Sequence, residues 1–148
     1  MGDEMKIVPV SKETLEDCFQ MRMELFPSLD ADFNKKELEI IIGSSIFQDF
    51  IGYINDEPAA LLELSFRNIV DECLSSPVGY IEGIYIKEKF RGKNYGKKMV
   101  EFAEEFFRTN GCTEMASDAE IENTASHKFH LSCGFQETYR IVQFKKNL

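Results

Sequence analysis

Apolar and polar residues along the chain follow two periods, one typical of strands and one typical of helices. Apolar runs of strand length predict strands at 5–10, 47–54, 59–66, 79–86 and 112–116, with one or two more within 135–144. Apolar residues at helical spacing predict helices at 11–26, 34–43, 95–109 and 123–132. The order βααβββαβαβ predicts an α/β (α+β mixed) fold with helices on both faces of one sheet.

Turn and capping residues sharpen the borders of these elements. The residues 55–58, Asn-Asp-Glu-Pro, separate two strands and predict a hairpin, so the first half of the sheet should be antiparallel. Asn34 followed by Glu37 resembles a capping box at the start of the second helix. Strand–helix–strand units in the second half predict parallel neighbours. The sheet is therefore expected to be mixed.

Length and composition fit a single domain that spans residues 1–148. Hydrophobic residues make up 43% of the chain, which is enough for one core. No apolar run approaches the roughly 18 residues of a membrane span. The N-terminus lacks a basic segment followed by a long apolar one, so no secretory signal is expected and the cytoplasm is the predicted location. The four cysteines are scattered, which favours reduced thiols over a zinc site.

The net charge of −9 is unevenly distributed. Residues 87–98 carry five lysines and one arginine against one glutamate, a local +5 that leaves −14 for the rest. A chain this acidic is a poor nucleic-acid binder, because phosphates must be neutralised. A basic segment on an acidic body predicts an anionic ligand at that segment and a cationic one elsewhere, unless the lysines form only a solvated loop.

Residues 79–98 carry the most informative pattern, a strand followed by a small and basic loop and then directly by a helix. Backbone N–H groups at such a helix start bind anions, and Gly92 and Gly96 leave room for a phosphate. Three basic side chains add full charges: Arg91, Lys93 and Lys97. The spacing fits neither a Walker A loop nor a dinucleotide-binding fingerprint. The loop is expected to bind a phosphate, with a purely structural basic loop as the alternative.

This loop resembles the pyrophosphate loop of the GCN5-related N-acetyltransferase (GNAT) superfamily, Q/R-x-x-G-x-G/A. The sequence RGKNYG at residues 91–96 matches its first and last positions. Asn94 replaces the usual glycine and is the best non-glycine residue for a left-handed backbone. Asn123 and the pair Gly134-Phe135 match two further features, so the resemblance covers nearly the whole chain. It implies a GNAT fold: a mixed, mostly antiparallel sheet of six to seven strands, splayed between the fourth and fifth and flanked by four helices.

Three longer runs, SPVGYIEGIYI, CTEMASDAEIEN and SHKFHLSCGFQET, resemble the aminoglycoside 6'-N-acetyltransferases. The resemblance implies transfer of acetyl from acetyl-CoA, as co-substrate and without a metal, to the 6'-amine of a polycationic aminoglycoside, which confers resistance. The acetyl-CoA contacts implied are Ile84, Tyr85, Ile86, Arg91, Gly92, Lys93, Asn94, Tyr95, Gly96, Lys97, Asn123 and His130. The substrate contacts implied are Phe26, Glu82, Asp118 and Tyr139. The resemblance implies an aromatic substrate contact where this chain has Ile69, and an acidic one where it has Tyr139.

Amide formation from a thioester requires an unprotonated amine, a stabilised oxyanion and a protonated leaving thiolate. Glu82 lies within the strand before the loop and Asp118 at the end of the next strand, so both carboxylates are expected to face one cleft. Asp118 is predicted to be the main amine contact and proton acceptor with Glu82 as its partner, and the two roles are interchangeable. Gly83 permits a bulge that turns the Ile84 N–H toward the acetyl oxygen.

Two histidines lie one helical turn apart, His127 and His130. His130 stands where the superfamily often has a tyrosine near the sulfur, so it either protonates the thiolate or packs against CoA. No third ligand joins the histidines, and no metal site is expected.

Two other functions remain open. One is a GNAT acetyltransferase for another cationic amine, such as a polyamine or a protein or peptide amine, and Ile69 and Tyr139 keep it open. The other is a non-catalytic acyl-CoA-binding module, against which the paired acids Glu82 and Asp118 argue. The expected partners are acetyl-CoA and a small polycationic amine, and a homodimer is compatible with each function.

Overall fold

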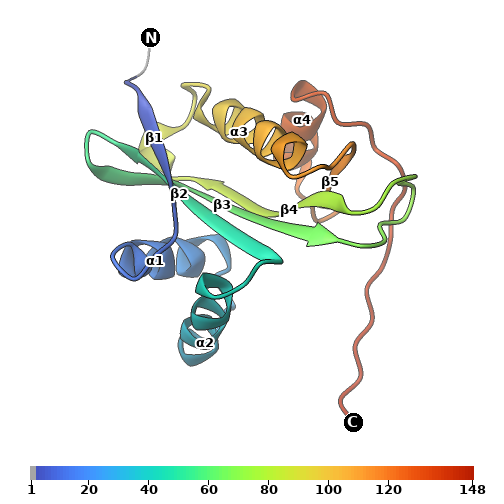
Figure 1. Ribbon diagram of the computed structural model, residues 1–148, viewed down its shortest axis with the longest axis horizontal. Helices are drawn as coiled ribbons and strands as arrows, with labels where there is room; N and C mark the ends of the chain where they lie inside the picture. Colours follow the sequence, from blue (N-terminus) through green and yellow to red (C-terminus); the bar gives the residue numbers. More distant parts are fainter. Residues whose placement is uncertain (1–2) are drawn as a thin grey trace. The chain divides into compact units, whose positions relative to one another are not determined.

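A computed structural model describes residues 3–148 in two units, the first of which ends at Ser117 and holds one sheet (Figure 1). Its elements are β1 (Met5–Pro9), α1 (Leu15–Leu25), α2 (Ala31–Ile42), β2 (Phe47–Ile54), β3 (Glu57–Arg67), β4 (Val78–Ile86), the 3₁₀ turn η1 (Glu88–Phe90), α3 (Tyr95–Thr109) and β5 (Met115–Ser117). The second unit runs from Asp118 to Leu148 and holds α4 (Thr124–Ser132). Within residues 3–148, no helix is both long and apolar enough to cross a membrane.

The sheet has the order β1-β2-β3-β4-β5. The first four strands pair antiparallel and β4 pairs parallel with β5, so the predicted mixed sheet is confirmed. The last β4–β5 pair joins Ile81 to Ser117, although β4 continues to Ile86, so β4 extends beyond its parallel partner. The described residues form five strands, one fewer than the lower end of the predicted range, and four α-helices.

The hairpin predicted between β2 and β3 is confirmed. Its turn residues Asn55 and Asp56 have φ of 49° and 62°, both in the left-handed region. Two consecutive left-handed residues are typical of the type I′ turn, whose twist matches that of the flanking strands. This tight connection fixes the register in which β3 runs between β2 and β4.

The second helix begins earlier than the sequence predicts. Asp30 caps α2, because its carboxylate accepts a hydrogen bond from the Phe33 N–H at 3.0 Å. Asn34 lies inside the helix and is buried, and its Oδ1 accepts from Arg22 Nε at 2.7 Å. Glu37 also binds Arg22. The capping box of Asn34 and Glu37 is therefore wrong, since tertiary contacts to α1 use both side chains.

The strands predicted within residues 135–144 are wrong, because no strand follows α4. The apolar side chains of Ile141, Val142 and Phe144 are 67%, 77% and 88% exposed. A segment with strand-like apolar residues forms a strand only where a neighbouring strand supplies partners for its N–H and C=O groups. In the part of the chain that the structure describes, no strand pairs with this segment.

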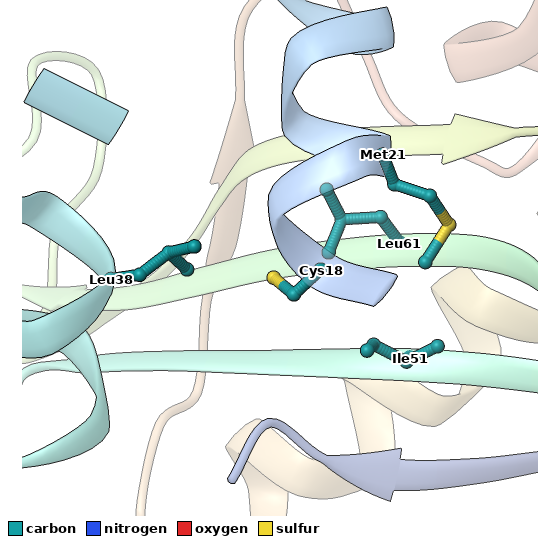
Figure 2. Packing of buried hydrophobic residues seen from close by; sticks show 5 residues of the cluster. All are labelled: Cys18, Met21, Leu38, Ile51 and Leu61. Carbon is teal, nitrogen blue, oxygen red and sulfur yellow. The ribbon is translucent and has the colours of Figure 1, made fainter. Parts of the chain in front are cut away.

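Helices α1 and α2 cover one face of the sheet (Figure 1). Their apolar side chains meet those of β2 and β3 in a cluster of five buried residues, which Figure 2 shows from close by: Cys18, Met21, Leu38, Ile51 and Leu61. Leu61, Glu63 and Ser65 are alternate residues of β3 and therefore share this face. The face thus changes along β3 from apolar to polar.

Helix α3 covers the opposite face (Figure 1). Phe50 of β2 meets the rings of Phe102 and Phe106 edge-on, with centroids 4.9 and 5.2 Å away. At Gly79 of β4, an added Cβ would lie 2.2 Å from the Phe107 ring. Only glycine allows the helix to approach the sheet this closely, and this contact fixes α3 behind β4.

Candidate active site

A bulge interrupts β4 at Glu82. Leu64 of β3 pairs with Ile81, but the preceding residue Glu63 pairs with Gly83, so Glu82 has no partner in the register. An unpaired extra residue of this kind bends the strand and redirects its side chain. The sequence prediction of a bulge beside Gly83 is confirmed. The proposed role of the Ile84 N–H at the acetyl oxygen stays a prediction.

The bulge directs Glu82 into an ion pair that the sequence did not indicate. Arg67 Nε and Nη2 donate to the two carboxylate oxygens of Glu82 at 3.0 and 2.8 Å, and Ser65 Oγ donates at 2.6 Å. The guanidinium carbon of Arg67 also lies 3.5 Å from the centre of the Tyr80 ring. The side chains of Glu82 and Arg67 are 29% and 41% exposed. We call the ion pair of Arg67 and Glu82 the rim pair, and Ser65 is a further donor to it.

An open pocket of about 330 Å³ lies beside the rim pair. Ser65, Arg67 and Glu82 line its polar side. Three apolar residues of β2, β3 and the preceding loop line the rest: Ile46, Phe47 and Phe66. A pocket with apolar walls and a few fixed polar groups is typical of small-molecule sites.

The backbone at Gly83 rests on side chains from α1 and β3. A Cβ at this position would lie 3.1 Å from Glu63 Oε1, 3.1 Å from Leu25 Cδ2 and 3.5 Å from Phe26 Cζ. Phe26, predicted to cover the substrate, therefore lies half-buried beside the bulge. Glycine is the residue that fits here without displacing these neighbours.

Behind Gly83 lies a second set of polar side chains, which we call the buried ionic group: the charged Arg22, Glu37, Asp49 and Glu63 and the neutral Asn34. Asp49 and Glu63 are paired residues of β2 and β3, and both are about 5% exposed. Arg22 binds Glu63 through Nη1 and Glu37 through Nη2. Asp49 Oδ2 is buried with no hydrogen-bond partner among the described residues and lies 3.8 Å from Arg22 Nη1. Burial, followed by the charge of Glu63, raises the pKa of Asp49 well above its ordinary value, and burial raises the pKa of Glu63.

The basic loop after β4 has the backbone that anion binding requires. Gly92 and Asn94 have φ of 78° and 66°, so the left-handed backbone predicted for Asn94 is confirmed. The first backbone hydrogen bond of α3 runs from Lys98 N to Asn94 O, and the N–H groups of residues 95–97 precede it. No acidic residue occupies the first turn and Asn94 makes no side-chain cap. No acid of the helix's own first turn therefore competes with a bound anion.

The side chains of the loop differ in their availability. Arg91, Lys93 and Lys97 are exposed, and Arg91 Nε donates to the Ile86 carbonyl at 2.8 Å, which ties the loop to the end of β4. The side chain of Tyr95, in contrast, is buried, and its hydroxyl donates to the Asp3 carbonyl at 2.6 Å. A contact of Tyr95 with acetyl-CoA can therefore come only from its backbone N–H.

The end of β4 is apolar but only half-buried. Ile84, Tyr85 and Ile86 follow the bulge, beyond the last residue that pairs with β5. The Tyr85 hydroxyl donates to Glu24 Oε2 at 2.8 Å, and burial, followed by this hydrogen bond, raises the pKa of Tyr85. The hydroxyl is thus fixed against α1, while the strand backbone borders an apolar surface.

The remaining predicted residues belong to the second unit. Asn123 caps α4, because its Oδ1 accepts from the Ser126 N–H at 3.1 Å. His130 Nδ1 lies 2.7 Å from the Ser126 carbonyl oxygen, a distance at which an Nδ1–H group donates to that oxygen. The His130 ring packs edge-on against Phe135 with centroids 5.2 Å apart. Tyr139 lies in the segment without regular structure.

Asp118 directly follows β5 in the sequence and begins the second unit. Its assignment as proton acceptor, and the expectation that it shares a cleft with Glu82, stay predictions. Within residues 3–148 no three metal-ligating side chains come together. Sequence reasoning missed Arg67 because the predicted strand stopped at residue 66. Its pairing with Glu82 depends on the register between two strands, which no local pattern reveals.

Comparison with known proteins places these features in one family. The profile described as the Acetyltransferase (GNAT) family matches residues 14–135. The aminoglycoside N(6')-acetyltransferase type 1 of Acinetobacter haemolyticus is 33% identical over 145 residues, covering 97% of this chain and 99% of the relative. The enzyme of the same name from Acinetobacter baumannii is 34% identical over 146 residues, with the same coverage.

Solved structures agree with the sequence comparison. Aminoglycoside N-acetyltransferase AAC(6')-Iy in complex with CoA has a TM-score of 0.93 and 32% identity, covering 100% of this chain and 98% of that one. The same enzyme with the bisubstrate analogue CoA-S-monomethyl-acetylneamine has a TM-score of 0.93 and 31% identity, covering 99% and 100% of the two chains. The expected fold is therefore confirmed.

Proposed function

Because the chain belongs to the acetyltransferase (GNAT) family, we propose that it transfers the acetyl group of acetyl-CoA to the 6'-amine of aminoglycoside antibiotics and so confers resistance to them. The observation that carries this proposal is the end-to-end similarity, above 30% identity, to enzymes named for that reaction. The basic loop after β4 and the rim pair of β3 and β4 supply the two kinds of ligand site that the reaction needs.

The residues around the loop fit acetyl-CoA. The N–H groups of residues 95–97 and the exposed charges of Arg91, Lys93 and Lys97 hold its pyrophosphate, because no acid of the helix's own first turn competes for them. The half-buried backbone of residues 84–86 lines the pantetheine arm. Asn123 and His130 complete the contacts with CoA. When bound, acetyl-CoA supplies an activated acetyl thioester.

The chain's own groups move the proton and hold the reacting atoms. The amine forms a C–N bond with the acetyl carbonyl carbon and the C–S bond breaks. Asp118 takes the proton that the amine loses, Glu82 accepts a hydrogen bond from the acceptor substrate, and the Ile84 N–H stabilises the oxyanion. His130 gives a proton to the leaving thiolate or packs against it, and Phe26 and Tyr139 contact the sugar rings.

Measured thiol release tests the acceptor. Kanamycin A should release CoA, whereas an analogue with a 6'-hydroxyl should not, and Asp118→Asn should lower turnover by about 10²–10⁴-fold. Equal release with both compounds would remove the 6'-amine from the reaction. CoA release with spermidine or a peptide, but with no aminoglycoside, would establish an acetyltransferase for another cationic amine. Ile69, which stands at the expected aromatic position and is 85% exposed, keeps this alternative open. No release with any amine would leave an acyl-CoA-binding module.

A matched pair of variants tests the cofactor loop. Gly96→Leu places a side chain where the pyrophosphate is proposed to approach, so acetyl-CoA affinity should fall strongly. Asn94→Gly should be nearly neutral, because glycine adopts the φ of 66° at least as readily. Titration calorimetry measures the CoA affinity of both variants. Unchanged affinity in a folded Gly96→Leu protein would show that the pyrophosphate binds elsewhere.

Domain organisation, location and assembly are parts of the same proposal. One catalytic domain over residues 1–148, working in the cytoplasm where acetyl-CoA is available, is the arrangement that we propose. A homodimer is proposed with it, and light scattering of the purified protein decides its oligomeric state.

A further inference from the structure

Glu82 has little acceptor capacity left. A carboxylate offers about four acceptor positions, two on each oxygen. Oε1 accepts from Ser65 Oγ at 2.6 Å and from Arg67 Nε at 3.0 Å, and Oε2 accepts from Arg67 Nη2 at 2.8 Å. One position on Oε2 remains for a bound molecule.

The charge of Glu82 is compensated as well. The forked contact with Arg67 neutralises the carboxylate, and a guanidinium keeps its charge at every accessible pH. Arg67 is itself held in place, because it lies 3.5 Å from the Tyr80 ring. The other charged side chains on this face of β2 and β3 are Asp49 and Glu63, and they pair within the buried ionic group around Arg22. The rim pair therefore meets its pocket as a neutral unit.

A neutral ion pair and an uncompensated carboxylate interact differently with an amine. A bare carboxylate attracts an ammonium and stabilises the protonated amine, which has no lone pair and cannot attack a thioester. A compensated carboxylate accepts a hydrogen bond from the neutral amine and adds little net attraction for the cation. The difference matters here because Glu82 is the bulged residue immediately before Gly83 and Ile84, which border the proposed thioester site.

We infer that Arg67 is a positioning residue that acts through Glu82: it cancels the carboxylate charge so that the amine of the substrate is bound at Glu82 in its uncharged, nucleophilic form. This inference rests on the proposed function and deepens it. The pocket beside the pair adds a second property of the acceptor. Ile46, Phe47 and Phe66 offer apolar surface next to one fixed acceptor, an arrangement that suits the C–H face of an aminosugar ring better than an extended polycation.

The variant Arg67→Met tests the inference, since it keeps much of the side-chain volume over Tyr80 and removes the charge. With kanamycin A, kcat at pH 7 and KM should both fall, each by about tenfold, so that kcat/KM changes little. The acidic limb of the kcat–pH profile should move up by about one unit, because an uncompensated Glu82 stabilises the ammonium form of the bound substrate. Arg67→Lys retains the charge and should stay within about threefold of the wild type in both constants.

The double variant Arg67→Met/Glu82→Gln identifies the residue through which Arg67 acts. In the Arg67→Met background, Glu82→Gln should return KM and the pH limb toward their wild-type values, because it removes the uncompensated carboxylate charge. A raised KM with an unchanged limb in Arg67→Met would overturn the inference, because Arg67 would then only hold Glu82 in place. Unchanged kinetics in a folded Arg67→Met protein would overturn it too.

A binding measurement separates this inference from the proposed function. Calorimetric titration of kanamycin A into the protein without acetyl-CoA at pH 6 should show tighter binding by Arg67→Met than by the wild type. If the wild type acetylates no aminoglycoside yet the variant binds this cation more tightly, the proposed reaction fails and the role of Arg67 stands. If the variant binds kanamycin A no more tightly, the role of Arg67 fails, whatever the enzyme acetylates.

Discussion

The buried ionic group and the rim pair use the same chemistry on the same face of the sheet, with opposite results. Glu63, Ser65 and Arg67 are alternate residues of β3, so one strand contributes to both. In the buried group, three carboxyl side chains surround one arginine. In the rim pair, one carboxylate meets one arginine at the surface. Depth and charge balance, rather than residue type, separate the two.

The difference in charge balance implies different roles for the buried ionic group and the rim pair. The buried group has three acids and one cation, and burial raises the pKa of both Asp49 and Glu63, so retained protons reduce its excess negative charge. The rim pair is neutral without a proton and borders an open pocket. We therefore expect the buried group to govern stability and its pH dependence, and the rim pair to govern the bound substrate.

Removing Arg22 should have the largest effect on stability. Arg22→Met leaves Asp49 and Glu63 buried without a cation, and breaking a buried ion pair in this way typically costs about 3–5 kcal/mol. Urea unfolding at pH 7 measures the loss. It should be smaller at pH 5, where the carboxyl groups are more fully protonated. A loss below about 1 kcal/mol at pH 7 would mean that the buried group contributes no more to stability than an exposed ion pair such as the rim pair.

Asp49→Asn should change how stability depends on pH. Because the folded-state pKa of Asp49 is raised, its contribution to stability is fully present below the unfolded-state pKa of about 3.9 and is lost as pH rises through the folded-state pKa. The wild type should therefore lose up to about 1.4 kcal/mol per pH unit relative to the variant over that window. Asparagine has nearly the same shape as aspartate and has no acidic proton to lose. Parallel curves of unfolding free energy against pH from 4 to 8 would show that Asp49 is charged in the native state.

The contrast between the groups also marks what the sequence can predict. Local patterns predicted α3 and the β2–β3 hairpin, because spacing and turn residues determine these features within a few positions, whereas the left-handed Asn94 followed from the resemblance of its loop to a known one. Neither arginine contact was predicted. Arg22 meets Glu63 across 41 positions and Arg67 meets Glu82 across 15, so both depend on packing and strand register.

The errors have the same origin. Asn34 was assigned to a cap from its local spacing, but the buried group uses its side chain. Residues 135–144 have the apolar content of one or two short strands, yet a strand also needs a partner. The resemblance to a family supplied candidate site residues, whereas Arg67 emerged only from the register of β3 and β4.

Gly83→Ala tests how tightly the two groups are coupled, because Gly83 lies against Glu63 of the buried group and next to Glu82 of the rim pair. The added methyl group would meet Glu63 Oε1 and Leu25 Cδ2 at 3.1 Å. Leu25 can move, but Arg22 holds Glu63, so we expect a loss of about 1 kcal/mol of unfolding free energy. Turnover should fall further than stability, since the bulge that carries Glu82 must shift. Unaltered kcat would indicate a bulge that tolerates the methyl group.

The smallest effect on stability is expected at the rim pair. Arg67→Met removes a cation from a pair that is 29% and 41% exposed, and exposed pairs contribute at most about 1 kcal/mol because water and side-chain entropy oppose them. Salt distinguishes it from the buried group. At 1 M salt the screening length is about 3 Å, so the difference between Arg67→Met and wild type in urea unfolding should vanish. The loss in Arg22→Met should persist under the same conditions, because solvent ions do not reach Arg22, Asp49 and Glu63, which are about 5% exposed. If instead Arg67→Met lost more unfolding free energy than Arg22→Met, the contact of Arg67 beside the pocket would be the one that stabilises the fold. The substrate role of the rim pair would then have to be tested in a variant that restores stability.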